Sequence, residues 1–140
     1  MLTNESISAF AKDWYHKLDI HAPMVDLLPM LFDTELEMVF PEATVYGFAG
    51  FEGWFQRVVR TFFDEIHTVK ECHSEINDDT ASVKVVVKWE ASFWNPPNDK
   101  SKRIVLDAFQ TWELKELHGN IKIVKYIVDE IKYYDGSAQL

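Results

Sequence analysis

Two histidines occupy positions from which a side chain could do acid–base chemistry. His67 opens an alternating run of residues after a predicted helix, and His21 lies shortly before Pro23, where the first predicted helix ends. Because imidazole titrates near neutral pH, a histidine that faces a pocket can take up and return a proton. Each position also has a structural interpretation, in which His67 bonds to the backbone and His21 interacts with a helix dipole. We take both as candidate catalytic residues, with the structural roles as the alternatives.

A third histidine suggests a metal site but has the wrong spacing. Glu71, His73 and Glu75 alternate along one predicted strand. Such side chains rarely converge on one ion without ligands from elsewhere in the fold. The glycines of "GFAGFEG" do not follow a strand of a βαβ unit, so a phosphate-binding loop is not indicated either. We therefore predict no metal site and no cofactor.

Aromatic residues form the second group that could build a site. The sequence has ten Phe, five Tyr and five Trp, and large aromatic side chains either fill a core or wall a pocket. A polar Gln110 lies among apolar inward neighbours and must find a partner, which could be a tryptophan indole, a water or a ligand. The residues expected to line a ligand pocket are Trp14, Trp54, Trp89, Gln110, Trp112 and Tyr126.

The predicted helices come first along the chain. Thr3 can cap a first helix, with Leu2 and Ile7 forming a hydrophobic staple, and an apolar stripe at helical spacing continues to Leu18. A short helix is predicted over residues 23–31 and a short strand over residues 34–40. A third helix follows, with its buried stripe spanning residues 51–66.

Long strands fill the rest of the chain. Residues 83–93 carry an apolar side chain at every second position, in a run about twice the usual strand length. Strands are predicted over residues 67–76, 81–95, 103–117 and 121–134, the last apolar in both registers. Helices followed by hairpin-connected strands indicate an α+β fold, with three N-terminal helices packed on the concave face of a strongly curved antiparallel sheet.

Length and charge narrow the class of protein. The 140 residues are expected to form one domain, 1–140, and the net charge of −9, without a Lys/Arg cluster, argues against a nucleic-acid partner. No apolar run approaches the roughly 20 residues of a membrane helix, and the first residues lack the pattern of a leader. Cys72 is the single cysteine, which excludes an intrachain disulfide and favours the cytoplasm.

The order and lengths of these elements resemble the nuclear transport factor two-like superfamily, and within it the SnoaL-like (polyketide cyclase/dehydratase-like) group. "IHTVKECHSEINDDTASV", residues 66–83, is similar to the histidine-led strand, acidic hairpin turn and return strand of that group. "HGNIKIVKYIVDE" is similar to its final hairpin. The resemblance implies a cone-shaped, cystatin-like α+β roll around an apolar pocket.

Transferring catalytic positions from that superfamily separates two kinds of chemistry. The carboxyl groups of the steroid-isomerase branch would fall on Phe40 and on Gln110 or Thr111, so chemistry of that kind is not expected. In the dehydratase-like branch the histidine that opens the strand after the third helix matches His67, and the acid near the end of the first helix falls at about His21.

The resemblance therefore implies a cofactor-independent lyase or isomerase acting on a small hydrophobic or aromatic molecule. His67 would be the acid/base, and Gln110 with Tyr126 would orient a polar group of the substrate. The same superfamily includes non-catalytic members, so a binding protein is equally compatible with the sequence.

The outer face of the predicted sheet supports that alternative. Val86, Trp94 and Phe109 should point away from the helices, and a cluster of large exposed apolar residues commonly marks an interface. Relatives in the superfamily also pair through this face. We expect a homodimer, and the alternative function is a non-catalytic binding or assembly module that acts through the outer sheet face.

Overall fold

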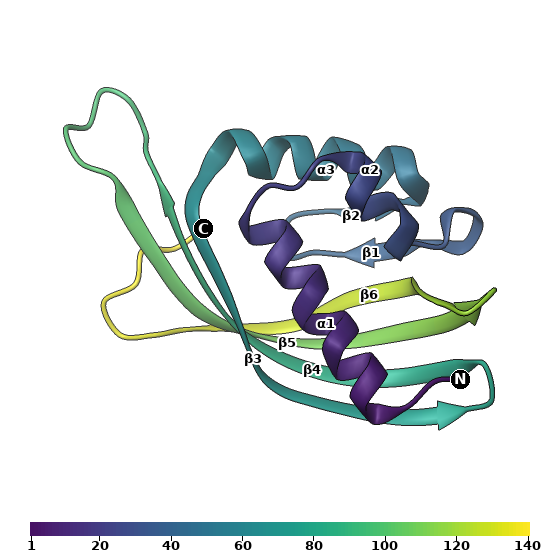
Figure 1. The fold of residues 1–140 in the computed structure, drawn as a ribbon. Coiled ribbons are helices and arrows are strands. Elements are labelled where there is room, and N and C mark those ends of the chain that lie inside the picture. Colours follow the sequence, from purple (N-terminus) through teal and green to yellow (C-terminus); the bar gives the residue numbers. More distant parts are fainter.

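The computed structural model describes all 140 residues, with helices over the concave side of a curved six-stranded sheet (Figure 1). The helical segments are α1 (Asn4–Asp19), α2 (Met24–Leu27), η1 (Leu28–Met30), η2 (Asp33–Glu35) and α3 (Gly47–Thr61). The strands are β1 (Glu37–Val39), β2 (Thr44–Tyr46), β3 (Phe62–Asn77), β4 (Thr80–Phe93), β5 (Lys102–Leu117) and β6 (Asn120–Tyr133). The predicted α+β roll is confirmed. No helix in it is long and apolar enough to span a bilayer.

The sheet is almost entirely antiparallel. Its strand order is β2-β1-β6-β5-β4-β3, and the four long strands follow one another as hairpins. The exception is β1, which runs parallel to β6, so the sheet is mixed at that edge. The strand predicted over residues 34–40 is only Glu37–Val39, and the short β2 beside it was not predicted.

The first helix is built as its sequence predicts. The Thr3 side chain accepts a hydrogen bond from the Ser6 backbone N–H at 3.0 Å, and the Ser6 hydroxyl accepts one from the Thr3 N–H at 2.9 Å. Leu2 and Ile7 are both buried, as expected for a staple across the cap. The buried stripe of α1 also includes Tyr15, which is next to Trp14.

The third helix is shorter than predicted. It ends at Thr61, and residues 62–66 form the start of β3. Phe62 and Phe63 lie opposite Phe93 and Ser92 of β4, so ladder pairing and the strand preference of aromatic residues outweigh the helical spacing. Ile66 is 48% exposed and is not part of a buried helical stripe.

Alternation correctly predicts the inward face of the central strands. Val83, Val85 and Val87 of β4 are buried, as are alternate residues of β5 from Ile104 to Leu114. On β6, a register shift opposite Glu113 and Leu114 brings both Ile123 and Tyr126 to the buried side. This extra residue explains why β6 is apolar in both registers.

A bulge near the start of β3 lets Phe62 share the inner face of the sheet with Glu65 and His67. Phe63 lies opposite Ser92 and Ile66 opposite Glu90, so Asp64 and Glu65 share one position of β4. Asp64 adopts a positive φ of 51°. Phe62 packs edge-on against Trp89 on the inner side, and Glu65 and His67 line the cavity on the same side.

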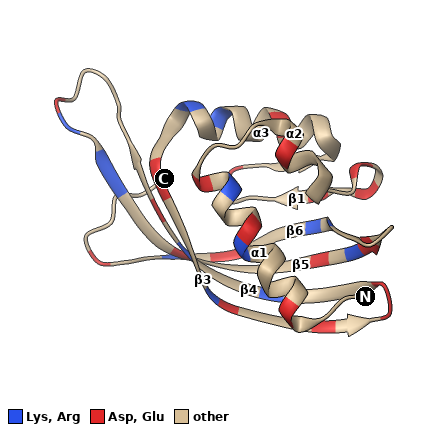
Figure 2. Ribbon diagram, viewed as in Figure 1, with Lys and Arg blue, Asp and Glu red and all other residues tan.

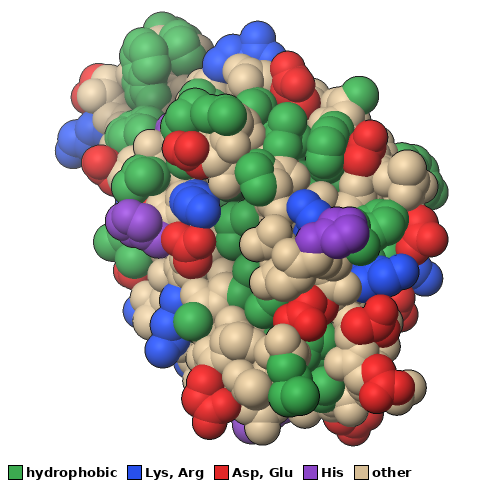
Figure 3. All heavy atoms as spheres, turned by 45° about the vertical axis from the view of Figure 1, so that its right-hand side comes forward, with side chains coloured by type: hydrophobic (Ala, Val, Ile, Leu, Met, Phe, Trp, Pro, Cys, Tyr) green, Lys and Arg blue, Asp and Glu red, His purple; other side chains and the backbone are tan.

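Arg103 of β5 holds this bulge in place. Its Nη1 donates to the Asp64 carbonyl oxygen at 2.6 Å and to the Ser92 hydroxyl at 2.9 Å. Elsewhere Lys and Arg are interspersed with Asp and Glu along the strands (Figure 2). On the face shown in Figure 3, hydrophobic side chains likewise lie between charged ones.

The left-handed backbone at Asp64 gives a first prediction. A β-branched residue is disfavoured at positive φ, so Asp64→Val should lower the free energy of unfolding by about 1–2 kcal/mol. Asp64→Gly is the matched control, because glycine adopts this conformation without strain. Urea unfolding of both variants measures the difference, and equal unfolding midpoints for Val and Gly would contradict the backbone argument.

Candidate functional site

A cavity of about 580 Å³ lies between the helices and the concave face of the sheet. Fifteen of its 22 lining residues are hydrophobic, and the lining comes from α1, α3, the loop after β1, the four long strands and the C-terminal residue Leu140. A volume of this size and composition is typical of a site for a small organic molecule. The curved strands therefore enclose a hollow rather than a fully packed core.

The structure separates the six predicted pocket residues into two groups. Trp54, Trp89, Gln110 and Tyr126 line the cavity. Trp14 and Trp112 are fully buried behind Tyr126, at ring-centroid distances of 6.1 and 5.2 Å from it. These two tryptophans pack the core that supports the cavity wall.

Gln110 is held by the wall itself. Its Oε1 accepts hydrogen bonds from the Trp112 indole N–H at 2.9 Å and from the Tyr15 hydroxyl at 3.1 Å. The Tyr15 and Tyr126 hydroxyls are also hydrogen-bonded to each other at 2.9 Å. The amide oxygen thus has two protein partners. One is a tryptophan indole, which was among the partners considered from the sequence, and the other is a tyrosine hydroxyl.

Burial keeps both of these tyrosines neutral. It raises the pKa of Tyr126 to about 12, and it raises the pKa of Tyr15 well above the usual 10.0, with a further increase from the neighbouring Tyr126. Since the Tyr15 proton is donated to Gln110, the Tyr126 hydroxyl is the donor in the bond between the two tyrosines, and its oxygen can still accept a hydrogen bond from a polar group in the cavity.

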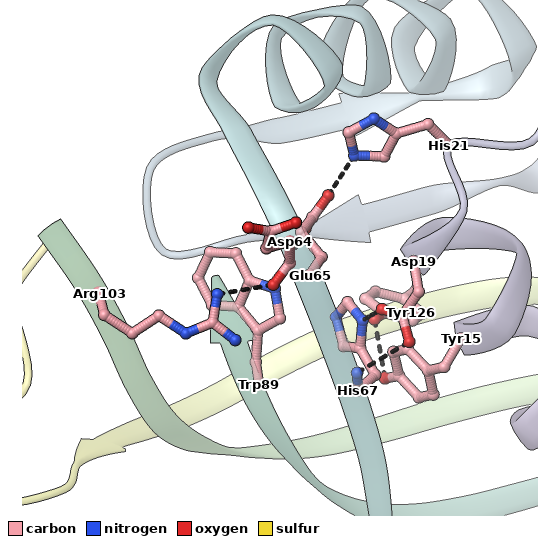
Figure 4. Close-up of polar contacts among 9 residues, drawn as sticks. All are labelled: Tyr15, Asp19, His21, Asp64, Glu65, His67, Trp89, Arg103 and Tyr126. Atoms are coloured by element: carbon pink, nitrogen blue, oxygen red, sulfur yellow. Dashed lines mark hydrogen bonds and ion pairs between the residues drawn. The ribbon is translucent and has the colours of Figure 1, made fainter. Parts of the chain in front are cut away.

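His67 is paired with an acid at the wall of the cavity (Figure 4). Its Nδ1 lies 2.5 Å from Asp19 Oδ1, and its backbone N–H donates to Asp19 Oδ2 at 2.9 Å. The ring stacks on Tyr15, with centroids 4.6 Å apart and planes inclined by 21°. Because Asp19 accepts from Nδ1–H, the second nitrogen, Nε2, is left as the basic atom of the ring.

Asp19 was not predicted, since the acid of this pair was placed at about His21. Asp19 is the last residue of α1, and His21 follows in a left-handed turn, with φ of 51°. The turn directs the His21 side chain away from the dyad. A carboxylate at a helix C-terminus opposes the helix dipole, and this unfavourable position was the sequence signal that it has a partner elsewhere.

His21 is paired with a second buried acid, Glu65. Its Nε2 is hydrogen-bonded to Glu65 Oε2, and the Trp89 indole N–H donates to Glu65 Oε1 at 3.1 Å. The Glu65 side chain is only 2% exposed, whereas His21 is 24% exposed. Glu65 was missed because residues 51–66 were predicted to be helical, which concealed that Glu65 and His67 share one face of a strand.

The alternating acids of β3 lie outside the cavity. Glu71 and His73 approach to 3.6 Å, and both side chains are largely exposed. No group of three or more His, Cys, Asp or Glu side chains is arranged to hold a metal ion.

No model of a protein family matches the sequence, and no curated protein matches it. Solved structures do. A proposed aromatic ring hydroxylase from Novosphingobium aromaticivorans superposes with a TM-score of 0.79 at 13% identity, over 94% of this chain and 92% of that one. A type 2 hexachlorocyclohexane dehydrochlorinase (LinA) superposes with a TM-score of 0.72 at 16% identity, over 96% of this chain and 90% of that one.

A proposed scytalone dehydratase from Novosphingobium aromaticivorans matches with a TM-score of 0.69 at 13% identity, over 96% of this chain and 94% of that one. The chain has the nuclear transport factor two-like fold. The predicted likeness to the SnoaL-like group is confirmed at the level of the fold.

Tyr126 gives a prediction on pH dependence. Between pH 10 and pH 12 the folded protein keeps the Tyr126 proton that the unfolded chain has released. Stability should therefore fall as pH rises through this window, by at most roughly 1.4 kcal/mol per pH unit from this residue. Below pH 10 the residue is protonated in both states and contributes no pH dependence.

Urea unfolding at a series of pH values from about 9 to 11 tests this. Tyr126→Phe should show a shallower loss of stability above pH 10 than the unsubstituted protein. Tyr46→Phe is the control, because Tyr46 is 65% exposed. Parallel curves for the unsubstituted protein and Tyr126→Phe would show that this phenol does not titrate as described.

Proposed function

We propose that the protein binds a small hydrophobic or aromatic molecule in the cavity and catalyses a cofactor-independent elimination, a lyase reaction, on it. The observation that carries the proposal is the His67–Asp19 pair in the wall of a mostly apolar cavity. A base held by an acid in a water-poor site is an arrangement suited to removing a proton from carbon. Structural neighbours that include a dehydrochlorinase and a proposed dehydratase support the same class.

His67 is the base in this reaction. Nε2 takes a proton from a carbon next to the carbonyl of the substrate, and the resulting imidazolium is stabilised by the Asp19 carboxylate at 2.5 Å from Nδ1. Asp19 also accepts the His67 backbone N–H, so the position of the carboxylate does not depend on the charge of the ring. The stacked Tyr15 ring adds a favourable contact with the cation.

Tyr126 and Gln110 serve as the orienting groups. Both line the cavity, and the Tyr126 phenol stays neutral because burial raises its pKa to about 12. The Tyr126 proton is donated to Tyr15, whose own proton goes to Gln110, so the Tyr126 oxygen can accept a hydrogen bond from the substrate. The side-chain NH2 group of Gln110 can donate to the carbonyl oxygen as this oxygen gains negative charge during proton removal. The indoles of Trp54 and Trp89 provide flat apolar surface for the rest of the molecule.

His67→Gln tests the catalytic assignment. The probe is the water adduct of benzylideneacetone; this adduct is a hydrophobic β-hydroxy ketone, and its dehydration gives benzylideneacetone. In His67→Gln, kcat for the adduct should fall by about 100-fold or more, since a general base accelerates a reaction by about 10²–10⁴-fold. Product binding, followed by quenching of tryptophan fluorescence, and the thermal midpoint should change little.

His73→Gln is the matched control, because His73 lies on the same strand with 77% of its side chain exposed. Turnover that survives in His67→Gln would remove His67 as the base. Loss of benzylideneacetone binding in that variant would instead assign the ring to the binding of the ligand.

A specific observation favours a second function, that of an assembly module. Trp94, Ile66 and Phe63 are 53%, 48% and 42% exposed, and they lie on the neighbouring strands β3 and β4 or just beyond their paired ends. Of the outward residues predicted with Trp94, Val86 and Phe109 are half-buried, and Lys132 lies over the Phe109 ring. An exposed apolar strip of this kind fits a homodimer contact at one end of the outer face.

Native mass spectrometry tests the dimer. The expected particle has twice the 16.4 kDa mass of the chain at micromolar concentration, and Trp94→Ser should shift it toward the monomer. Lys132→Ser, on the outer face away from the strip, is the control. A monomer at all concentrations would exclude the homodimer, and an unchanged dimer in Trp94→Ser would place the contact elsewhere.

A further inference from the structure

A second His–carboxylate pair, His21 and Glu65, reaches the cavity through Glu65 and has no role in the reaction proposed above. Glu65 and His67 both line the cavity, and they share one face of β3 because they are two residues apart on the strand. In Figure 4 each points toward the end of α1, where Asp19 and His21 receive them. The strand therefore contributes to two His–carboxylate pairs: it supplies the carboxylate, Glu65, to one pair and the histidine, His67, to the other.

Two acids of the cavity lining, Glu65 and Glu42, accept a hydrogen bond from a tryptophan indole, and Glu65 is by far the more buried. Glu42 accepts from Trp54 at 2.8 Å and is exposed. The Glu65 side chain is 2% exposed, and its two oxygens are bonded to Trp89 and to His21. A buried carboxylate is costly without a compensating charge or proton, and the His21 imidazole is the partner of Glu65 that can supply either.

The pair also connects two environments. Glu65 lines the cavity, whereas His21 lies behind it and is 24% exposed to solvent. The Trp89 N–H fixes one oxygen of the carboxylate and cannot itself be lost as a proton. The other oxygen faces His21, so a proton can enter from solvent through the imidazole and reach the cavity through the carboxyl group.

We propose that Glu65 and His21 form a proton relay that protonates the leaving group. The inference rests on the proposed elimination and adds the second half of it. His67 Nε2 takes the proton from carbon, the electrons of that C–H bond form the new C=C bond, and the C–O bond breaks. The departing oxygen takes the proton of the Glu65 carboxyl group and leaves as water.

The relay then resets without any co-reactant. His21 takes a proton from solvent and returns it to Glu65, and the His67 imidazolium releases its proton to solvent. One proton is taken up and one is released in each turnover, so the only products are the unsaturated ketone and water. His67 thus acts as the base and Glu65 as the acid. A single residue could not remove one proton and donate another in the same step.

This division of roles determines the leaving group. Hydroxide is a poor leaving group and needs a proton, whereas chloride departs as an anion without one. The buried acid therefore points to a β-hydroxy carbonyl compound with a hydrophobic body as the class of substrate. Such a substrate places its hydroxyl at Glu65 and its acidic C–H at His67.

Two adducts of benzylideneacetone with the same carbon skeleton test the relay. The water adduct loses hydroxide and the hydrogen chloride adduct loses chloride, and both give the same absorbing product. Glu65→Gln keeps an acceptor for Trp89 but has no proton to give. It should lower kcat/KM for the water adduct by about 100-fold and change that for the chloride adduct by less than about threefold.

His21→Asn tests the solvent end of the relay. Asparagine tolerates the left-handed backbone found at His21, so the fold should be kept. Slower return of the proton should lower kcat for the water adduct by about tenfold and leave the chloride adduct unaffected. His118→Asn is the matched control, because His118 also has a positive φ, of 53°, and lies in the exposed turn between β5 and β6.

The outcomes separate the relay from the function on which it rests. Equal slowing of both adducts by Glu65→Gln, or no slowing of either, would overturn the relay. Loss of both adducts in His67→Gln together with loss of the water adduct alone in Glu65→Gln would support both. Unsubstituted protein that processes only the chloride adduct would overturn the relay and keep the elimination, and protein that processes neither would overturn the elimination and the relay with it.

Discussion

The Asp19 carboxylate is the link on which the site depends. It terminates α1, and it accepts both the backbone N–H and the Nδ1–H of His67 on β3. One side chain thus fixes the angle at which the helix meets the strand and the tautomer of the histidine. The unfavourable position of a negative charge at a helix C-terminus is offset by these two donors. Since α1 also buries Tyr15, which stacks on the same imidazole, the helix holds the ring by an aromatic contact as well.

The bulge at Asp64 is the second requirement. Without the extra residue, Phe62 and Glu65 would face opposite sides of the sheet, because side chains alternate along a strand. The bulge lets Phe62 pack on Trp89 while Glu65 accepts the indole N–H of the same tryptophan. Arg103 supports this geometry from outside the cavity by donating to the Asp64 carbonyl group. The position of a buried charge in the cavity is therefore set by a residue on another strand.

The sequence predicted what depends on periodicity and missed what depends on local exceptions to it. The capped first helix, the inward faces of β4 and β5 and the curved α+β architecture follow from apolar spacing at 3.6 or 2 residues, and all are confirmed. The start of β3 was misassigned because residues 62–66 also fit a helical stripe, and only pairing with β4 decides between the two.

Two acids were missed for related reasons. Glu65 shares the inner face with His67 by alternation, but this was concealed because residues up to 66 also fit a helical stripe, and Asp19 owes its role to where α1 ends relative to β3. His67 could be singled out because the histidine opens a recognisable strand pattern. Its partner was not, because the only local sign at Asp19, a carboxylate at a helix C-terminus, does not indicate which strand 48 residues later supplies the contact.

The polar side chains in and behind one wall of the cavity are hydrogen-bonded to one another. Gln110, Tyr15, Tyr126 and Trp112 bond among themselves, so the wall keeps its shape without a ligand. These groups are neutral. Among the ionisable residues of the lining, Glu65 and His67 are more buried than Glu42 and Arg57, and each is hydrogen-bonded to a partner. In an apolar enclosure the electrostatic interactions of such pairs are strengthened because little water screens them. A self-satisfied neutral wall thus concentrates the reactivity of the cavity on one strand, where a base and an acid are held two residues apart.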